Sequence, residues 1–256
     1  MQSTAIADTL SQEIKTVITR HLPGWLETDE SLRSRLHRAL LVENETISYD
    51  DFLTAYADVH AEWIDGKVLV MSPASDRHQD IVDFFTALLR IFVENYRLGW
   101  VRSAPFQMKL PFSIGREPDI LFVAQERMNR LRLNYLDGPA DLAAEVVSPE
   151  SVARDRGEKF SEYEQAGVAE YWLLDPLRKQ AAIYLLVDGS YQLTRPHDDG
   201  RVHSSVLPGF WLREEWIWET PLPPVLDTLR ELGVLPDLKI ATDELINCTG
   251  QEDDEM

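Results

Sequence analysis

The sequence predicts a mixed α/β fold in which a central β-sheet is flanked by helices, with a helical extension at the N-terminus. The first observation is an amphipathic helical pattern over residues 75–99 with a dense apolar face. The second is Asp65-Gly66, which separates two alternating apolar runs as the turn of a hairpin does. The third is a series of short apolar runs, interrupted by a further helical pattern, over residues 100–194. Together they favour one large domain in this chain of 256 residues.

Residues 1–45 are expected to form the helical extension. Two stretches there space their apolar residues by three and four positions, TLSQEIKTVITRHL and ESLRSRLHRALL, with Pro23-Gly24 between them. The main domain is expected over residues 46–225. Residues 226–256 would add a C-terminal helix and a disordered acidic tail, TGQEDDEM.

The main domain begins with a short amphipathic helix, SYDDFLTAYAD, that Ser48 can cap. The hairpin follows, and then the long helix, with Ser75 or Asp76 as its cap and Gly99 just beyond its end. The remaining apolar runs are expected to be strands: WVRSAPFQMKL, PDILFVA, DLAAEVVS, EYWLLDP, AAIYLLVDG and SYQLTRP.

Composition narrows the class of protein and of site. Hydrophobic residues make up 44% and charged residues 27%, and no apolar run is long enough to cross a bilayer. The first residues, MQSTAIADTLSQEIKTV, lack the basic and apolar regions of a secretory signal, so we expect a cytoplasmic protein with no membrane partner. The single Cys248 excludes an internal disulfide and thiolate-rich zinc sites, which leaves oxygen-ligated or histidine-ligated metals.

The net charge of −19 argues against a protein that coats nucleic acid by electrostatics alone. Residues 97–132 are nevertheless locally basic, with seven basic residues against three acidic ones. The basic residues are Arg97, Arg102, Lys109, Arg116, Arg127, Arg130 and Arg132. They would form a positive rim beside a nucleic-acid site, or a solvated face that balances acidic neighbours.

Two acids lie inside apolar, strand-like runs: Asp119 in EPDILFV and Glu145 in AAEVVSPES. An ionised carboxylate is costly to bury without a partner, so such positions normally hold a salt bridge, a shifted pKa or a metal ion. The alternative is that both acids lie at strand ends in water. If a cation is shared, the two carboxylates should lie on neighbouring strands and close together.

Lys159 and Tyr163 are spaced i, i+4 on a helix expected from about Ser151 to Ala166, and should therefore share one face. An ammonium near two metal-binding carboxylates can stabilise developing negative charge or orient an attacking water. The alternative for Lys159 alone is an exposed helix lysine.

Four motifs occur in an order and spacing that resembles the Uma-two family of endonucleases, a branch of the PD-(D/E)XK, restriction endonuclease-like superfamily: EWIDGKVLVMSPASDRH, EPDILFV, AEVVSPES and DRGEKFSEYEQAGVAEYWLLDP. The resemblance covers roughly residues 48–225. It implies a mixed sheet flanked by helices and an endonuclease that hydrolyses phosphodiester bonds of nucleic acid with Mg²⁺ or Mn²⁺. DNA is the expected substrate.

By this resemblance, Asp119, Glu145 and the Val146 carbonyl are the expected metal ligands. The superfamily lysine would stand two residues after Glu145, where this chain has Val147. The resemblance therefore assigns the lysine's role to Lys159 on the following helix, where it would steady the charge of the transition state.

Two further residues match the family pattern. Glu62 is an additional metal or water ligand, or one half of a cross-strand salt bridge. His78 is catalytic, or a capping and packing residue, and the helix dipole would disfavour its imidazolium form. Tyr163 and Trp172 are interpreted mainly as core residues.

A homodimer is expected, since superfamily nucleases often pair to cut both strands, and EYWLLDP with AAIYLLV could leave an apolar sheet edge. Two other functions stay open: a nuclease-fold protein with little activity that acts as a binding module, and a metal-dependent hydrolase of smaller substrates. Nucleophile elbows and glycine-rich phosphate loops are absent from the sequence.

Overall fold

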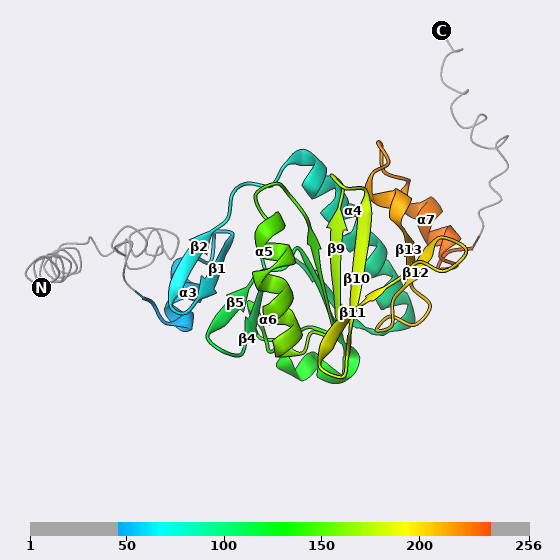
Figure 1. Ribbon diagram of the computed structural model, residues 1–256. Helices are drawn as coiled ribbons and strands as arrows, with labels where there is room; N and C mark the ends of the chain where they lie inside the picture. Colours follow the sequence, from blue (N-terminus) through cyan, green and yellow to red (C-terminus); the bar gives the residue numbers. More distant parts are fainter. Residues whose placement is uncertain (1–45, 237–256) are drawn as a thin grey trace, which may run out of the picture.

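The computed structural model describes residues 46–236 (Figure 1). The helical extension expected over residues 1–45 and the acidic tail lie outside the described residues. In chain order, the elements are α3 (Tyr49–Ala55), β1 (Ala61–Ile64), β2 (Lys67–Val70), α4 (Asp76–Tyr96), β3 (Gly99–Ser103), β4 (Gln107–Leu110), β5 (Ile114–Arg116), β6 (Ile120–Ala124), η2 (Gln125–Arg130), β7 (Tyr135–Asp137), β8 (Leu142–Val146), α5 (Val152–Arg156), α6 (Glu158–Ala166), β9 (Glu170–Asp175), β10 (Gln180–Val187), β11 (Ser190–Thr194), β12 (Arg201–His203), β13 (Trp211–Arg213), η3 (Glu214–Ile217) and α7 (Val225–Glu231).

The predicted mixed α/β fold is confirmed, but the strands form more than one sheet. A six-stranded sheet has the order β11-β10-β9-β8-β6-β3, and a five-stranded sheet has the order β2-β1-β5-β4-β7. In the six-stranded sheet, β8 and β9 are parallel and the other pairs are antiparallel. Figure 1 shows α5 and α6 in front of this sheet, α4 behind it, and the five-stranded sheet with α3 at one side.

Side chains of the central strands alternate between two cores, as the period of two in a strand requires. On β8, Leu142, Ala144 and Val146 pack into the core that contains α4. Ala143 packs into the core on the side of α6, where Tyr163 is also buried. Glu145 therefore projects from β8 toward α6.

The pairing of β6 with β8 brings the two acids together. These strands are antiparallel, with Ile120 opposite Ala144, so the register extended by one residue sets Asp119 opposite Glu145. Asp119 is 8% exposed and Glu145 is 3% exposed, which contradicts the alternative that both stand in water. Asp119 lies just before β6 and Glu145 lies on the neighbouring β8, and both line one cleft. A cation shared by the two carboxylates stays a prediction.

Local capping signals were predicted well. Ser48 caps α3, and Ser75, not Asp76, caps α4 by accepting a hydrogen bond from the His78 N–H. The long helix ends at Tyr96, with Arg97 in the left-handed region at φ 55°, and Gly99 already belongs to β3.

The prediction of one strand in WVRSAPFQMKL is wrong, because β3 and β4 belong to different sheets. Pro105 has no N–H to donate to a strand ladder, and the chain leaves the six-stranded sheet at this point. The predicted helix from about Ser151 to Ala166 is divided into α5 and α6 at Gly157. A Cβ at Gly157 would stand 2.7 Å from the Ala153 carbonyl oxygen, so a larger residue would disturb this break.

The apolar edge expected for dimerisation is also absent from the described sheet. Strands β9 and β10 are internal, and the edges are β3 and β11. The homodimer stays a prediction that this edge does not support. Within residues 46–236, every helix is too short or too polar to cross a membrane.

The core around α4 makes a test of the fold. Leu88 is 0% exposed in this core, so Leu88→Ala should lower the free energy of unfolding by about 2–5 kcal/mol. Arg90→Ala, on the exposed side of the same helix, is the matched control and should change it by less than about 1 kcal/mol. Urea denaturation measures both, and equal losses would contradict the packing described.

Candidate functional site

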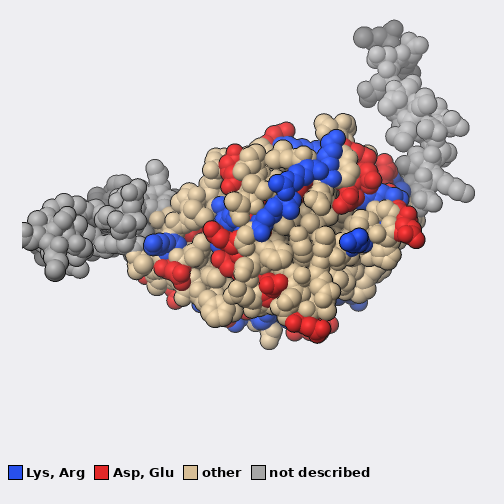
Figure 2. All heavy atoms as spheres, viewed as in Figure 1, with Lys and Arg blue, Asp and Glu red and all other residues tan. Residues whose placement is uncertain are grey.

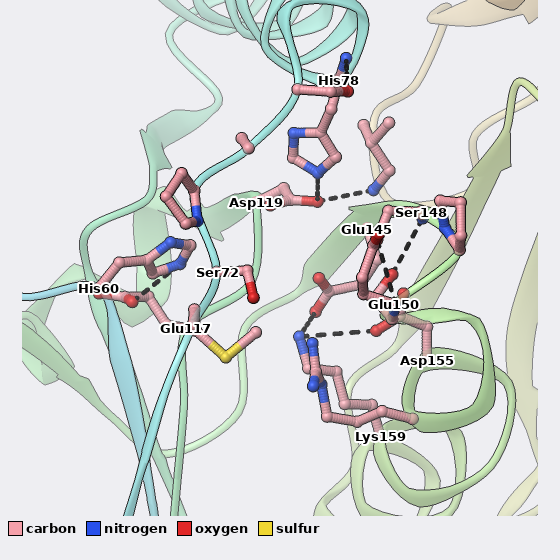
Figure 3. Close-up of a pocket in the computed structure, with 18 of the residues that line it drawn as sticks. His60, Ser72, His78, Glu117, Asp119, Glu145, Ser148, Glu150, Asp155 and Lys159 are labelled. Carbon is pink, nitrogen blue, oxygen red and sulfur yellow. Dashed lines mark hydrogen bonds and ion pairs between the residues drawn. The ribbon is translucent and has the colours of Figure 1, made fainter.

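A cleft of about 690 Å³ lies where the ends of β6 and β8 meet the first turn of α4 and the α5–α6 segment. Figure 3 shows the carboxylates and imidazoles of this cleft converging from separate elements. The charged and imidazole side chains that line it are His60, His78, Glu117, Asp119, Glu145, Glu150, Arg154, Asp155 and Lys159. Val146, at the end of β8, also lines the cleft.

Asp119 is fixed by two contacts at one oxygen. Its Oδ2 accepts a hydrogen bond of 2.7 Å from the Val146 N–H and lies 3.1 Å from His78 Nε2. The first contact ties the chain before β6 to the end of β8. No hydrogen bond from residues 46–236 reaches Oδ1 of Asp119.

Glu145 is held in the same one-sided way. Its Oε1 accepts hydrogen bonds from Lys159 Nζ at 2.8 Å and from the Tyr163 hydroxyl at 2.9 Å. Burial raises the pKa of Glu145 to about 8, although the Lys159 ammonium acts in the opposite direction. Its Oε2 accepts no hydrogen bond from the described part of the chain.

Lys159 is 2% exposed and stands among carboxylates. Its Nζ lies 2.8 Å from Glu145 Oε1 and 3.0 Å from Glu62 Oε1. Burial alone would lower the pKa of Lys159, but Glu145 and Glu62 raise it above its usual value, so the side chain stays an ammonium. The structure places Lys159 and Tyr163 toward the sheet, as predicted, and excludes an exposed helix lysine.

Glu62 forms the cross-strand salt bridge. Strands β1 and β5 are antiparallel with Trp63 opposite Gly115, which sets Glu62 opposite Arg116, and Glu62 Oε2 lies 2.6 Å from Arg116 NH1. Its other oxygen contacts Lys159, and the side chain does not line the cleft. Burial would raise the pKa of Glu62, but Lys159 and Arg116 lower it to about 2.

Arg116 links the five-stranded sheet to α6. It is 0% exposed, and its Nε and NH2 lie 2.6 and 2.7 Å from the two oxygens of Glu162. Such a two-point contact fixes direction as well as distance. Because Glu162 is on the same helix as Lys159, this pair helps to fix where the ammonium stands.

The protonation expected for His78 is corrected by the structure. Burial lowers the pKa of His78, but the hydrogen bond to Asp119 and the negative charges of Asp119 and Asp155 together raise it above its usual value, which favours the imidazolium. A carboxylate in direct contact affects the pKa of His78 more than the helix dipole does, and the expectation rested on the dipole alone.

A second imidazole–carboxylate pair was missed in the sequence. His60 Nε2 lies 3.0 Å from Glu117 Oε2, and Glu117 also accepts a hydrogen bond from the Ala61 N–H. Spacing in the sequence could have identified Glu117. It stands two residues before Asp119 in an extended run, so both side chains are expected on the same side of the chain. Trp172 packs with α4 on the opposite face, as a core residue.

None of the basic residues of residues 97–132 lines the cleft, so the positive rim predicted beside it gains no support from the cleft lining. Arg127 pairs with Asp141, and Arg132 pairs with Asp137. Arg116 is buried, and Arg102 stacks on Trp100. A count of charges within one sequence segment does not include the ion pairs that its residues form with other segments in the folded protein.

Basic side chains near the cleft come from other segments. Figure 2 shows Lys and Arg side chains in a band on the drawn face, over the region where α5 and the β9–β10 turn lie in Figure 1. Those two segments carry Arg154, Arg156, Arg178 and Lys179. Arg154 itself lines the cleft.

Comparison with known proteins gives the family. The Uma2 family model, described as "Putative restriction endonuclease", matches residues 49–215. The chain belongs to the Uma2 family. A search of curated proteins found no match.

Among solved structures, this Uma2 chain is similar to one described as a "putative nuclease belonging to DUF820" from Anabaena variabilis. The identity is 18%, the TM-score is 0.57, and the match covers 67% of this chain and 97% of the other. At this identity the similarity supports the fold, which agrees with the restriction endonuclease-like class predicted from the motifs.

The carboxylates of this Uma2 chain suit a hard divalent cation. Asp119 and Glu145 each keep one oxygen free of hydrogen bonds from the described residues, and oxygen donors are the ligands that Mg²⁺ prefers. Across residues 46–236, no three His, Cys, Asp or Glu side chains already stand as a metal-binding group. Two carboxylates fit Mg²⁺ nevertheless, because it keeps several waters and binds substrate phosphate.

The low pKa of Glu62 predicts how stability depends on pH. A folded pKa near 2, below the unfolded 4.5, means that ionised Glu62 stabilises the fold above pH 4.5 and that this contribution is lost as pH falls toward 2. Glu62→Gln should therefore be less stable than wild type at pH 7, with a difference that shrinks by roughly 3 kcal/mol toward pH 2.

The matched control is Glu158→Gln, which removes an exposed carboxylate 3.4 Å from the same guanidinium. Its unfolding free energy should stay close to that of wild type at every pH. Urea denaturation between pH 7 and pH 2 measures all three proteins. A Glu62→Gln difference that is independent of pH would contradict the buried salt bridge.

Proposed function

We propose that this Uma2 chain is a metal-dependent endonuclease that hydrolyses phosphodiester bonds of nucleic acid, with DNA as the substrate. Mg²⁺ or Mn²⁺ would be held by Asp119, Glu145 and the Val146 carbonyl. The observation that carries the proposal is the pair of buried carboxylates beside a buried ammonium at the wall of one cleft. Family membership supports the nuclease class.

A bound divalent ion supplies two things to phosphodiester hydrolysis: it polarises a phosphoryl oxygen and lowers the pKa of water. The protein would contribute metal ligands and a positive charge whose positions do not change when the ion and the substrate bind. The Val146 N–H and His78 hold Asp119 through Oδ2, so its other oxygen is oriented before any ligand arrives. Lys159 and Tyr163 do the same for Glu145.

Lys159 is proposed to stabilise the negative charge that grows on the phosphate in the transition state. Its ammonium is preorganised at 2.8 Å from Glu145, and a fixed cation in a water-poor site costs no reorganisation when the charge develops. His78 is proposed as a positioning residue, since its Nε2 contacts Asp119. Glu62 is proposed to act through Lys159, because it does not reach the cleft.

The surroundings of the cleft suit an extended substrate. A second hollow of about 300 Å³ shares His78, Ser148 and Leu177 with the cleft, and it is also lined by Arg77, Lys179 and Trp218. Cations along a groove attract phosphates, and aromatic faces can stack on bases. This continuity favours a polymer over a small phosphodiester.

Removal of Asp119 tests the nuclease proposal. Wild type should cut DNA with Mg²⁺ or Mn²⁺ and not in EDTA, and Asp119→Asn should lower the rate at least about 100-fold, because one ligand loses its charge. Linear and circular double-stranded DNA, single-stranded DNA, RNA and a small aryl phosphodiester form the substrate panel. Asp76→Asn, an acidic change at the start of α4 outside the cleft lining, is the control.

The pattern of cleavage distinguishes the endonuclease from the binding module and from the hydrolase of small substrates. Cutting of the small phosphodiester alone would favour the small-substrate hydrolase. Binding of nucleic acid without cutting under any metal would favour the binding module and overturn the proposal. Equal rates for wild type and Asp119→Asn would remove Asp119 from the site.

Lys159 has its own test. Lys159→Met should lower the cleavage rate at least about 100-fold while Mg²⁺ binding persists, because an ammonium is not a ligand. The loss of a buried partner should also cost about 3–5 kcal/mol of stability, so circular dichroism must confirm folding at the assay temperature. Lys67→Met, at an exposed position of β2 outside both hollows, is the matched control and should keep more than about half the rate. Full activity of Lys159→Met would contradict the assignment.

A further inference from the structure

His60 lines the cleft just before β1 and has no part in the hydrolysis proposed above. Its side chain is 38% exposed, whereas the side chain of its partner Glu117 is 3% exposed. Figure 3 shows the imidazole of His60 and the carboxylate of Glu117 on the opposite side of the cleft from Lys159 and Asp155. The pair therefore belongs to a second wall, which a substrate lying in the cleft would face.

One ring nitrogen of His60 is held and the other is free. Nε2 lies 3.0 Å from Glu117 Oε2. No hydrogen bond from residues 46–236 reaches Nδ1, and this atom is not buried. Because a carboxylate accepts hydrogen bonds, the contact with Glu117 places a proton on Nε2 and fixes the direction of the Nδ1 position.

The main chain around the pair is fixed as well. The Met71 N–H donates to the His60 carbonyl oxygen at 2.9 Å, next to the pairing of Ala61 with Val70 in the β1–β2 hairpin. The Ala61 N–H donates to Glu117 Oε2 at 3.2 Å, so this carboxylate holds both the imidazole and the start of β1. A side chain supported in this way loses little conformational freedom when it meets a ligand.

The surroundings of His60 favour a hydrogen-bond donor at Nδ1. The hydrogen bond with Glu117 raises the pKa of His60, and burial acts in the opposite direction. The negative charges of Glu117, Asp119 and Glu62 raise this pKa further, so that it lies above its usual value. An imidazolium donates from both nitrogens. With Nε2 on Glu117, the Nδ1–H is left for a ligand.

The cations Lys159 and Arg154 of the cleft are engaged by acids. Lys159 Nζ bonds Glu145 and Glu62 at 2.8 and 3.0 Å, and Arg154 Nε stands 3.9 Å from Glu62 Oε2. Hydrogen bonds to phosphate oxygens fix the register and orientation of a nucleic acid on a protein. His60 offers such a hydrogen bond from the wall opposite Lys159.

We propose that His60, oriented by Glu117, donates a hydrogen bond from Nδ1 to a phosphate oxygen of the nucleic-acid substrate. This inference rests on the proposed function and deepens it, since it assigns a substrate contact to the β1 side of the cleft. The rival explanation is that His60 only holds Glu117 and the start of β1, which requires Nε2 alone.

Two substitutions separate the two nitrogens. The amide nitrogen of asparagine can take the place of Nδ1, whereas that of glutamine reaches as far as Nε2. His60→Gln should therefore keep the contact with Glu117 but weaken DNA binding at least about tenfold, because a hydrogen bond to a charged group is lost. His60→Asn should weaken DNA binding less than about threefold. His197→Gln, at an exposed position outside both hollows, is the matched control and should bind as wild type does.

Fluorescence anisotropy measures the binding of a short labelled DNA duplex, and of one of its strands, in the presence of Ca²⁺. Cleavage kinetics in Mg²⁺ give KM and kcat, and the loss in His60→Gln should appear mainly in KM, since the contact is made to the bound substrate. His60→Gln with the affinity of wild type, or equal losses in the two His60 variants, overturns the inference and leaves His60 with the structural role.

Failure of this inference and failure of the proposed function give different results. Wild type that binds DNA without cutting it overturns the nuclease, and the binding of the variants still tests His60. Wild type that cuts DNA, together with a His60→Gln variant that matches it, overturns the substrate contact alone. Wild type that neither binds nor cuts DNA overturns both.

A second measurement uses the wild-type protein and applies if the His60 variants do not fold. Diethyl pyrocarbonate acylates accessible imidazole nitrogens, and peptide mapping locates each modified histidine. DNA should protect His60 from this reagent and leave His197 as reactive as before. Absence of protection at His60 overturns the inference.

Discussion

The buried ammonium of Lys159 is the contact on which the arrangement of the cleft depends. It joins Glu62 of the five-stranded sheet to Glu145 of the six-stranded sheet, at 3.0 and 2.8 Å. Breaking a buried ion pair on one side leaves an uncompensated charge and costs about 3–5 kcal/mol. The two sheets and α6 are therefore held in one relative position by a charge cluster at the bottom of the cleft. Arg116 strengthens this link through Glu62 and Glu162.

The same cluster determines the chemistry that the cleft can support. Each acid of the pair Asp119 and Glu145 uses one oxygen for internal hydrogen bonds, which leaves the other for a ligand. Because the neighbours of these acids are fixed, little reorganisation is needed when charge is added. Stability and reactivity thus draw on the same residues, so a change at Lys159 affects both, whereas a change at an exposed acid such as Glu150 affects neither strongly.

Features encoded by neighbouring residues were predictable from the sequence. The Asp65-Gly66 hairpin and the Ser75 cap follow from local patterns, and the family motifs pointed to Asp119, Glu145 and Lys159 as one site. Features that depend on distant partners were not predictable. A cross-strand salt bridge was one of the two roles expected for Glu62, but its partner Arg116, 54 residues away, could not be identified, nor could the pairing of Arg127 with Asp141.

The central claim is that the free oxygens of Asp119 and Glu145 define one cation position beside Lys159. The most direct measurement is the anomalous difference map of a crystal soaked in Mn²⁺. The account predicts one strong peak at coordination distance from both carboxylates, with the Lys159 ammonium still bonded to Glu145. A fully soaked crystal with no peak there, or with Mn²⁺ bound only at another place, would contradict it.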